Sequence, residues 1–204
     1  MNRNYPKDRT ALILVDVLND FLADDGKLNG QIKAQLQKTG LTDRLKTLLD
    51  QARAAGITIV YAPHGLDETT FNDFKTVLPR MQWGKENKVF WKGSVGAGFY
   101  EPLRPAEGEF IAQRHHIYNA FTNTDLHLHL QQAGIEKVVL AGLTSQTCVE
   151  GTGRHALEAG YHVTFLKDGV AEFTEEAHLA AINISYPAFG HAVLTVQQFL
   201  DEIK

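Results

Sequence analysis

Short apolar runs and longer amphipathic segments alternate along most of the chain. Two of the runs, residues 11–15 and 57–61, are rich in Ile, Val and Leu and have the length of buried strands. Between them, residues 43–55 place leucines at helical spacing and end before a glycine. Strands that alternate with helices in this way predict a parallel sheet with helices on both faces.

The same alternation continues through the second half of the chain. It predicts four further strands, at residues 109–113, 137–141, 161–166 and 192–194. It also predicts helices over residues 124–133, from about residue 148 to residue 160 and over residues 175–185, and a last helix after residue 194. We therefore expect residues 1–204 to form one doubly wound, Rossmann-like α/β domain with six parallel strands.

Residues 65–109 show no strong period and are rich in Gly, Trp and Phe. Long connections in compact domains tend to be functional, so this segment is predicted to build one wall of a pocket. Ligands of open α/β sheets bind outside the carboxyl ends of the strands. Catalytic and binding residues are therefore expected directly after the predicted strands.

Composition excludes several classes of partner. The chain has 204 residues, 44% of them hydrophobic, with 20 basic and 24 acidic side chains and a formal net charge of −4. This charge does not suit a nucleic acid or an anionic membrane, so a small-molecule substrate is expected. The longest apolar run has five residues and the N-terminus lacks the apolar core of a signal peptide, which predicts a cytoplasmic protein. The single cysteine allows no internal disulfide and no multi-cysteine metal site.

The first predicted strand ends at a carboxylate, Asp16. An acidic group directly after five apolar residues lies where burial and neighbouring groups can tune its pKa, which suits a general base. The alternative is that Asp16 only caps a turn or a helix.

The fourth predicted strand ends at a sharp turn that begins at Gly142 and presents the only thiol, Cys148, at the start of a helix. Backbone N–H groups at such a position favour the thiolate and can also hold an oxyanion. Cys148 is thus a candidate nucleophile. The alternative is a buried and unreactive thiol.

The third predicted strand ends at Arg114, His115 and His116, which could place a cation or a proton shuttle beside the thiol. Neighbours on an extended chain point to opposite faces, so at most one of these histidines is expected to face the site. His127 and His129 lie two apart on a predicted helix and would diverge, which favours solvated positions over metal ligation.

Two competing motifs are weaker. Cys148 and Arg154 have the spacing of a cysteine phosphatase loop, but His155 stands where that loop has a hydroxyl residue. Gly96 and Gly98 do not lie between a strand and a helix, and no Walker lysine loop is present, so neither NAD nor ATP is indicated. No cofactor is predicted.

Three of these strand ends together resemble the isochorismatase-like cysteine hydrolase family, and the resemblance extends from Ala11 to about Thr195. The segment Asp16-Val-Leu-Asn-Asp-Phe21 is similar to the family's Asp-x-Gln-Asn-Asp-Phe, with leucine in place of glutamine. The other matching segments are Gly142-Leu-Thr-Ser-Gln-Thr-Cys148-Val149 with Thr152, Asn119-Ala120-Phe121, and Thr124-Asp125-Leu126.

The resemblance implies a catalytic triad of aspartate, lysine and cysteine. Asp16 and Cys148 match it, whereas His115 stands at the lysine position. We expect His115 to take the lysine's place as an imidazolium; Lys92, from the long segment, is the alternative. The family also implies a cis peptide bond at Leu143-Thr144 and an oxyanion hole made by the N–H groups of Thr144 and Cys148.

The resemblance further implies a homo-oligomer, a dimer or a tetramer. Nicotinamidases of this superfamily carry a zinc site after the second strand. The equivalent residues 61–64 lack its aspartate, so no metal is expected here and nicotinamidase activity is disfavoured.

The sequence thus predicts a metal-independent hydrolase of a small amide or a related C–N compound, acting through a thioester on Cys148. Isochorismatase-type cleavage of a vinyl ether, with Asp16 as the acid, is one alternative. A binding or thiol-sensing module without turnover is another. The predicted aromatic walls of the pocket are Phe21, Trp91, Tyr118 and Phe121.

Overall fold

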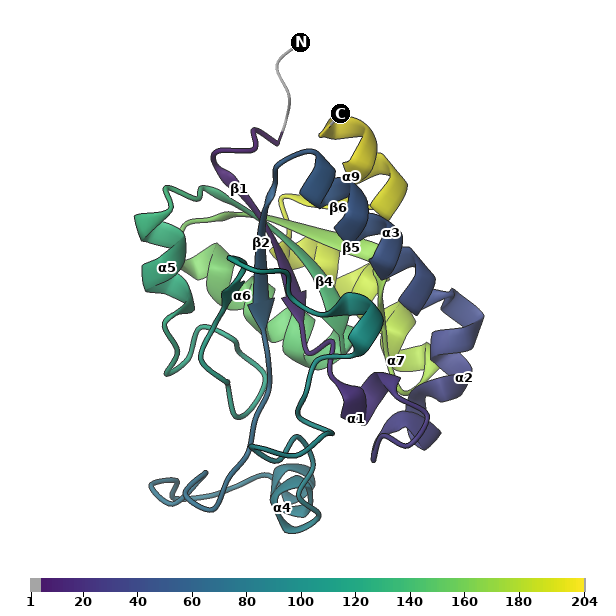
Figure 1. Cartoon of the computed structure of the whole chain (residues 1–204), viewed down its shortest axis with the longest axis vertical. Helices are drawn as coiled ribbons and strands as arrows, with labels where there is room; N and C mark the ends of the chain where they lie inside the picture. Colours follow the sequence, from purple (N-terminus) through teal and green to yellow (C-terminus); the bar gives the residue numbers. More distant parts are fainter. Residues whose placement is uncertain (1–4, 204) are drawn as a thin grey trace.

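The computed structural model describes residues 5–203 and contains one six-stranded sheet in the order β3-β2-β1-β4-β5-β6 (Figure 1). Every strand pair is parallel. The strands are β1 (Thr10–Val15), β2 (Thr58–Ala62), β3 (Phe110–Ile111), β4 (Lys137–Leu143), β5 (His162–Ala171) and β6 (Ala192–Leu194). The predicted doubly wound α/β fold is confirmed.

Helices cover both faces of this sheet (Figure 1). Those packed against one face are α2 (Asn29–Thr39), α3 (Leu41–Ala54) and α9 (Val196–Glu202). Those packed against the other are α5 (Leu126–Gln132), α6 (Glu150–Glu158) and α8 (Tyr186–Phe189). The remaining helices are α1 (Asn19–Leu22), α4 (Pro79–Glu86) and α7 (Glu175–Ala180).

The central strand β1 shows why the sheet has two cores. All six of its residues are buried. Leu12 and Leu14 join the core beneath α3 and α9, whereas Ala11, Ile13 and Val15 join the core beneath α5 and α6. Successive side chains of a strand point to opposite faces, so a strand covered on both sides reads as a continuous apolar run.

Several boundaries differ from the sequence prediction. The helix expected over residues 175–185 is divided into α7, a π-helical turn η3 (Ala181–Ser185) and α8. Strand β5 continues to Ala171, five residues beyond its predicted end, and β4 continues through Gly142. Gly142 has a φ of 115°, and a Cβ atom there would lie 2.1 Å from the carbonyl oxygen of Val15. The glycine therefore extends the strand at a point of close contact with β1 instead of ending it.

Residues 65–99, which we call the excursion, leave the sheet after β2 and carry α4 (Figure 1). The first residues of the excursion pair with a later part of it: the Leu66 N–H donates to the Phe90 carbonyl, and the Lys92 N–H donates to the Leu66 carbonyl. The carboxylate of Asp20 accepts the Phe90 N–H at 2.6 Å and the Lys27 N–H at 3.2 Å. A buried carboxylate within α1 thus anchors the excursion to the body of the protein.

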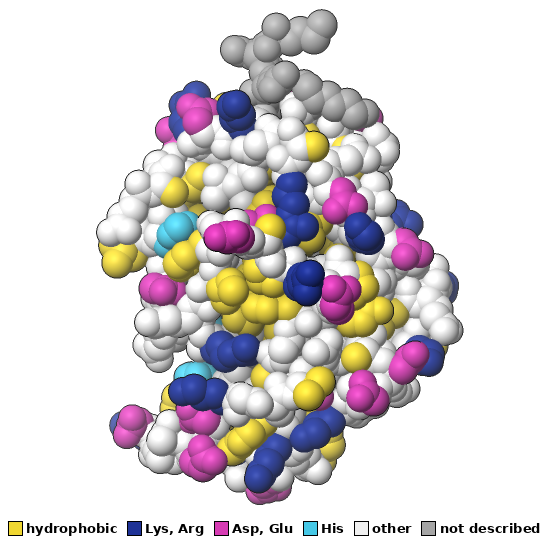
Figure 2. Space-filling view, viewed as in Figure 1, with side chains coloured by type: hydrophobic (Ala, Val, Ile, Leu, Met, Phe, Trp, Pro, Cys, Tyr) yellow, Lys and Arg dark blue, Asp and Glu magenta, His cyan; other side chains and the backbone are white. Residues whose placement is uncertain are grey.

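Figure 2 shows acidic and basic side chains interspersed over the face in view, with apolar side chains exposed between them. No helix among residues 5–203 has the length and apolar character needed to cross a membrane.

Candidate active site

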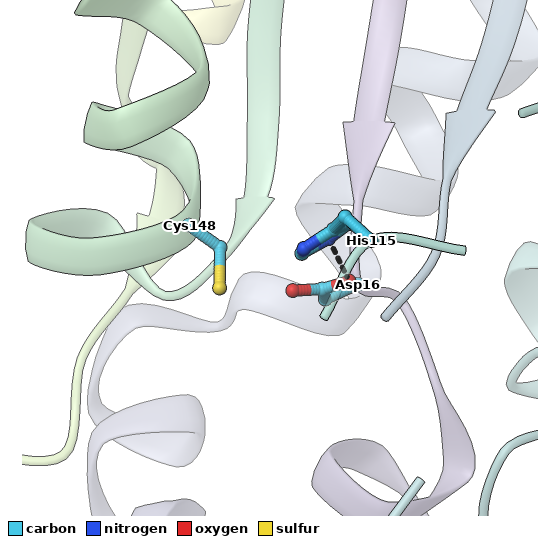
Figure 3. Close-up of side chains that lie close together, drawn as sticks. All are labelled: Asp16, His115 and Cys148. Atoms are coloured by element: carbon cyan, nitrogen blue, oxygen red, sulfur yellow. Dashed lines mark hydrogen bonds and ion pairs between the residues drawn. The ribbon is translucent and has the colours of Figure 1, made fainter. Parts of the chain in front are cut away.

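Asp16, His115 and Cys148 meet at the carboxyl edge of the sheet (Figure 3). Asp16 follows β1, Cys148 follows the neighbouring strand β4, and His115 lies a few residues beyond β3. One carboxylate oxygen, one imidazole nitrogen and the sulfur all lie within 4.8 Å of one another. The prediction that Asp16 and Cys148 come together, although 132 positions apart in sequence, is therefore confirmed.

The Asp16 side chain is fixed on one oxygen only. Its Oδ1 accepts the backbone N–H of His64 at 2.6 Å and lies 3.0 Å from His115 Nε2. Its Oδ2 is buried and has no hydrogen-bond partner among the described residues. Burial raises the pKa of this carboxyl, but the charge and hydrogen bond of His115 outweigh burial and hold the pKa below its usual value. Asp16 is therefore a carboxylate at neutral pH.

Cys148 lies within a π-helical turn, η2 (Ser145–Val149), directly before α6. Burial, followed by the negative charge of Asp16, raises the pKa of this thiol well above its ordinary value. A backbone hydrogen bond from Thr144 lowers the pKa, as expected for this turn, but burial and the carboxylate outweigh it. The resting group is a thiol, and it needs a base to become a nucleophile.

Only one of the two adjacent histidines faces the site, as the extended chain predicted. His115 pairs with Asp16 through Nε2, and its Nδ1 lies 3.2 Å from the carbonyl oxygen of Ile117. His116 turns away and its Nδ1 lies 2.7 Å from the Gly65 carbonyl oxygen.

His64, which the sequence prediction did not assign to the site, lies beside these groups. Its ring is 5.0 Å from the ring of His115 and 5.1 Å from that of Phe90. Burial, with the nearby His115, lowers the pKa of His64 to about 3, so its imidazole is neutral at neutral pH. A histidine after the second strand was visible in the sequence, but only its distance from Asp16 indicates a role at the site.

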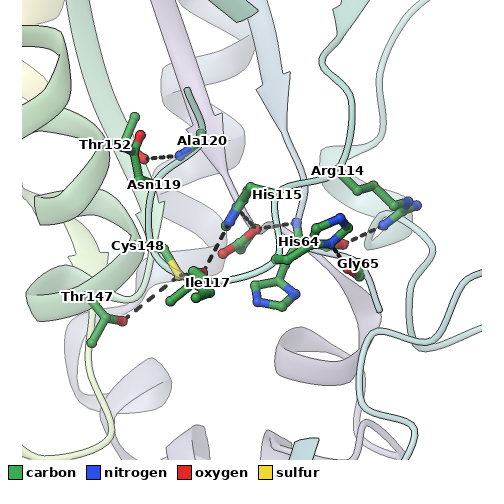
Figure 4. Close-up of polar contacts among 12 residues, drawn as sticks. His64, Gly65, Arg114, His115, Ile117, Asn119, Ala120, Thr147, Cys148 and Thr152 are labelled. Carbon is green, nitrogen blue, oxygen red and sulfur yellow. Dashed lines mark hydrogen bonds and ion pairs between the residues drawn. The ribbon is translucent and has the colours of Figure 1, made fainter. Parts of the chain in front are cut away.

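Arg114 ties the excursion to the carboxyl edge. Its guanidinium donates to the carbonyl oxygen of His64 at 2.6 Å (Figure 4). It also donates to the carbonyl oxygen of Ala97 at 2.8 Å. A Cβ atom at Gly65 would lie 2.3 Å from this side chain, so a glycine is needed there for Arg114 to pass. Arg114 therefore holds two backbone segments together, and it is not among the residues that line the cavity.

The peptide bond between Leu143 and Thr144 is cis, as the resemblance implied. Thr144 and Cys148 both line the cavity next to the sulfur. The Thr144 carbonyl oxygen accepts the Val149 N–H at 3.1 Å, which closes the turn that carries the thiol. The proposed oxyanion residues therefore share one compact turn at the end of β4.

Two residues that the sequence analysis did not identify form hydrogen bonds with the backbone of the turn around Cys148. The buried carboxylate of Glu172 accepts the Gln146 N–H at 2.9 Å and the Phe173 N–H at 3.0 Å. The Tyr186 hydroxyl donates to the Ser145 carbonyl at 3.0 Å. Both groups come from beyond the predicted end of β5, so their distance from Cys148 along the chain hid their contribution.

A cavity of about 220 Å³ opens beside Asp16 and Cys148. Its walls are mostly apolar. Its polar lining near the sulfur comes from Asp16, His64, Thr144 and Thr147. The excursion supplies Leu66, Arg80, Met81, Trp83, Gly84, Val89 and Phe90, which confirms the prediction that this segment forms a wall.

Two of the four predicted aromatic wall residues lie elsewhere. Phe21 and Tyr118 line the cavity, but Trp91 and Phe121 are not among its lining residues. Phe121 is buried and stacks on the His155 ring with centroids 4.9 Å apart. The sequence prediction placed aromatic residues at the cavity by their proximity to the motifs, but side-chain direction decides which of them reach it.

Two alternatives for charged groups at the site are also corrected. Arg154 pairs with Glu150 on α6 and its guanidinium lies 3.6 Å from the ring centroid of Phe189, so it cannot close a phosphate-binding loop with Cys148. Lys92 is exposed and is not among the residues that line the cavity, so it does not take the place of the lysine in the family's catalytic triad.

The Isochorismatase domain family model matches residues 10–198. An uncharacterized isochorismatase family protein, YwoC of Bacillus subtilis, is 32% identical over 98% of this chain and 97% of its own length. Ureidoacrylate amidohydrolase RutB of Pantoea ananatis is 25% identical, covering 98% of this chain and 84% of its own. The crystal structure of an isochorismatase-like hydrolase from Alkaliphilus metalliredigens superposes with a TM-score of 0.75 at 28% identity, covering 96% of this chain and 99% of that one.

Proposed function

The chain belongs to the isochorismatase family of hydrolases, and we propose that it cleaves a small amide or a related C–N compound through a covalent thioester on Cys148. The observation that carries this proposal is the meeting of the Asp16 carboxylate and the Cys148 thiol in the lining of one cavity. A neutral thiol with a carboxylate base in reach is a cysteine nucleophile and its activator.

In this mechanism Asp16 removes the thiol proton of Cys148 as the sulfur attacks the carbonyl carbon of the substrate. The N–H groups of Thr144 and Cys148 stabilise the oxyanion that forms. Asp16 then gives its proton to the nitrogen, the C–N bond breaks and the amine leaves. A water molecule, deprotonated by Asp16, attacks the thioester and releases the acid, and the proton returns to the sulfur.

His115 is proposed as the positioning residue for Asp16. Together with the backbone N–H of His64, it holds Oδ1 in place. Within the part of the chain that the structure describes, Oδ2 has no hydrogen-bond partner and is therefore free to accept the proton of Cys148. A histidine can supply this contact where the family resemblance implies a lysine.

The cavity and a relative support a small amide as substrate. A volume of about 220 Å³ suits a small molecule, and the mostly apolar walls favour a compact carbon body around the scissile bond. RutB of Pantoea ananatis, which matches nearly the whole chain, is named an amidohydrolase of ureidoacrylate.

Trapping of the intermediate tests the proposal. A panel of small amides, ureides and isochorismate is incubated with the protein and read by product release and by intact-mass spectrometry after acid quench. We expect an acyl adduct on Cys148, the only cysteine, and loss of amide hydrolysis in both Cys148→Ser and Cys148→Ala.

Other outcomes contradict the proposal in distinct ways. Amide hydrolysis retained by Cys148→Ala would exclude the thioester. Vinyl ether cleavage that survives the loss of the thiol would indicate isochorismatase-type chemistry with Asp16 as the acid. An absence of turnover with every substrate would favour a binding or thiol-sensing module.

A further inference from the structure

We propose that Asp16, His115 and Cys148 also form a binding site for a thiophilic divalent cation, with Zn²⁺ as the probe, and that the bound ion reversibly blocks the reactive centre. Binding of the ion is inferred from the ligand geometry alone. The block on turnover rests on the function proposed above.

The three side chains offer the donor set that zinc prefers: one carboxylate oxygen, one imidazole nitrogen and one sulfur, all within 4.8 Å of one another. Bond lengths of about 2.0–2.3 Å to a tetrahedral ion place its ligand atoms about 3.3–3.7 Å apart. Side-chain shifts of about 1 Å therefore suffice to close this set around an ion. Each ligand follows a different strand, so the sheet itself brings them together.

Asp16 provides a second and independent indication. The residue is 1% exposed, and its Oδ2 is buried without a hydrogen-bond partner among the described residues. A buried carboxylate oxygen without a partner is costly, and a cation would satisfy it. Oδ1 is already engaged by the His64 N–H, so the carboxylate is held in place while Oδ2 stays available.

His115 has the arrangement that metal-bound histidines usually show. Its Nδ1 lies 3.2 Å from the Ile117 carbonyl oxygen, which can only accept, so Nδ1 carries a proton. Histidine ligands commonly donate one ring N–H to a backbone carbonyl and bind the metal through the other nitrogen. The other nitrogen, Nε2, lies 3.0 Å from Asp16 Oδ1, so it gives up its proton and exchanges this contact for the ion when a cation binds.

An ion can reach the three side chains through the cavity, and a water molecule in the cavity can serve as its fourth ligand. Asp16 and Cys148 line it, so an ion held by three protein groups would keep one position for water on the cavity side. Binding forms bonds from the ion to sulfur, nitrogen and oxygen and releases the thiol proton, with any proton on Nε2, to solvent. The two negative ligands then balance the charge of the ion. The sulfur, once bound, cannot attack a substrate.

The test is a titration of the whole chain, stripped of metals with a chelator. Co²⁺ reports thiolate ligation by its near-ultraviolet charge-transfer absorption, and Zn²⁺ affinity is measured by competition with a chromophoric chelator. We expect one ion per chain, with displacement of Co²⁺ by Zn²⁺. Cys148→Ser should remove the charge-transfer band.

His115→Lys is the sharpest variant, because it keeps a cation beside Asp16 but removes the imidazole ligand. We expect Zn²⁺ to bind it at least about 100-fold more weakly. His116→Lys is the matched control: the neighbouring ring contacts the Gly65 carbonyl outside the cluster, so this variant should bind like the wild type.

The outcomes separate this inference from the proposed function. A wild-type protein without the charge-transfer band, or a His115→Lys variant that binds as tightly as the wild type, would overturn the site. Hydrolysis that proceeds undisturbed in the presence of bound Zn²⁺ would overturn the block. Thiolate-bound Co²⁺ in a protein that turns over no amide would support the site while contradicting the proposed hydrolysis.

Discussion

The carboxyl edge of the sheet and the excursion face the same cavity but are built in different ways. At the edge, Asp16, His115 and Cys148 are buried and follow strands whose main chains are fixed by the ladder of the sheet. On the excursion, Trp83 is 46% exposed and Leu78 is 52% exposed, around a helix of eight residues. The reacting groups lie on the most constrained part of the molecule, and part of the wall lies on a much less constrained one.

This contrast indicates a division of labour. A site on rigid strands can hold reacting atoms in place, whereas a partly exposed segment can change its side chains at little cost in stability. Changes at the edge should therefore alter the rate of the chemical step, and changes on the excursion should alter the binding of the substrate. Substitutions in the two regions can test this distinction.

The largest effect is expected at the edge, from Asp16→Asn. The amide keeps the shape of the side chain but cannot take the thiol proton, so kcat should fall by about 10²- to 10⁴-fold. The measurement is steady-state kinetics with an amide found in the substrate panel.

Asp20→Asn is the matched control for this loss. Asp20 is a second buried carboxylate of the same motif, but it accepts the Phe90 and Lys27 N–H groups and anchors the excursion. This variant should lose stability while its folded fraction keeps a kcat within about tenfold of the wild type. Equal losses of kcat in both variants would show that Asp16 has no catalytic role beyond that of a buried structural carboxylate such as Asp20.

A smaller effect is expected from His64, where the two regions join. Its pKa falls from 6.5 to about 3 on folding, because burial disfavours the charged ring. Between these values the unfolded chain binds a proton that the folded chain does not, so the free energy of unfolding falls as the pH falls below about 6.5. The loss is about 1.4 kcal/mol per pH unit, or about 2 kcal/mol at pH 5.

His64→Gln removes this titrating group. The free energy of unfolding, measured by urea unfolding at each pH, should then depend less steeply on pH between pH 6 and pH 4. Lost packing of the ring against Phe90 would lower stability equally at every pH, so only the slope tests the prediction. Parallel curves for the two proteins would show that His64 is not the group responsible.

The edge was predictable from sequence and the excursion was not, for physical reasons. Asp16 and Cys148 each follow an apolar run, and the rule that parallel strands end on one side places them together. The excursion has no repeating pattern, because its side chains alternate between cavity, body and solvent without a period. Trp91 was therefore assigned to the wall in place of Trp83, since nothing in the sequence tells which tryptophan turns inward.

The contribution of residues far along the chain to the turn around Cys148 could not be predicted from the sequence either. Glu172 holds the turn around Cys148 from the end of β5, and this contact depends on how far β5 extends. The predicted end at residue 166 came from the end of the apolar run, but the strand continues through Lys167 and Asp168. Pairing with β4 beyond its irregularity at Leu140 and Gly142 explains the extension.

The smallest effect is expected on the excursion, from Met81→Ala. Met81 lies on α4 and lines the cavity while remaining only partly buried, so its truncation removes apolar contact with a bound substrate. A loss of about 1 kcal/mol corresponds to a KM raised about fivefold, with kcat within about twofold of the wild type. Leu78→Ala, one residue before the same helix and outside the cavity lining, should leave both constants unchanged. If kcat fell in Met81→Ala while KM stayed constant, the excursion would take part in the chemical step, and the division between edge and excursion would fail.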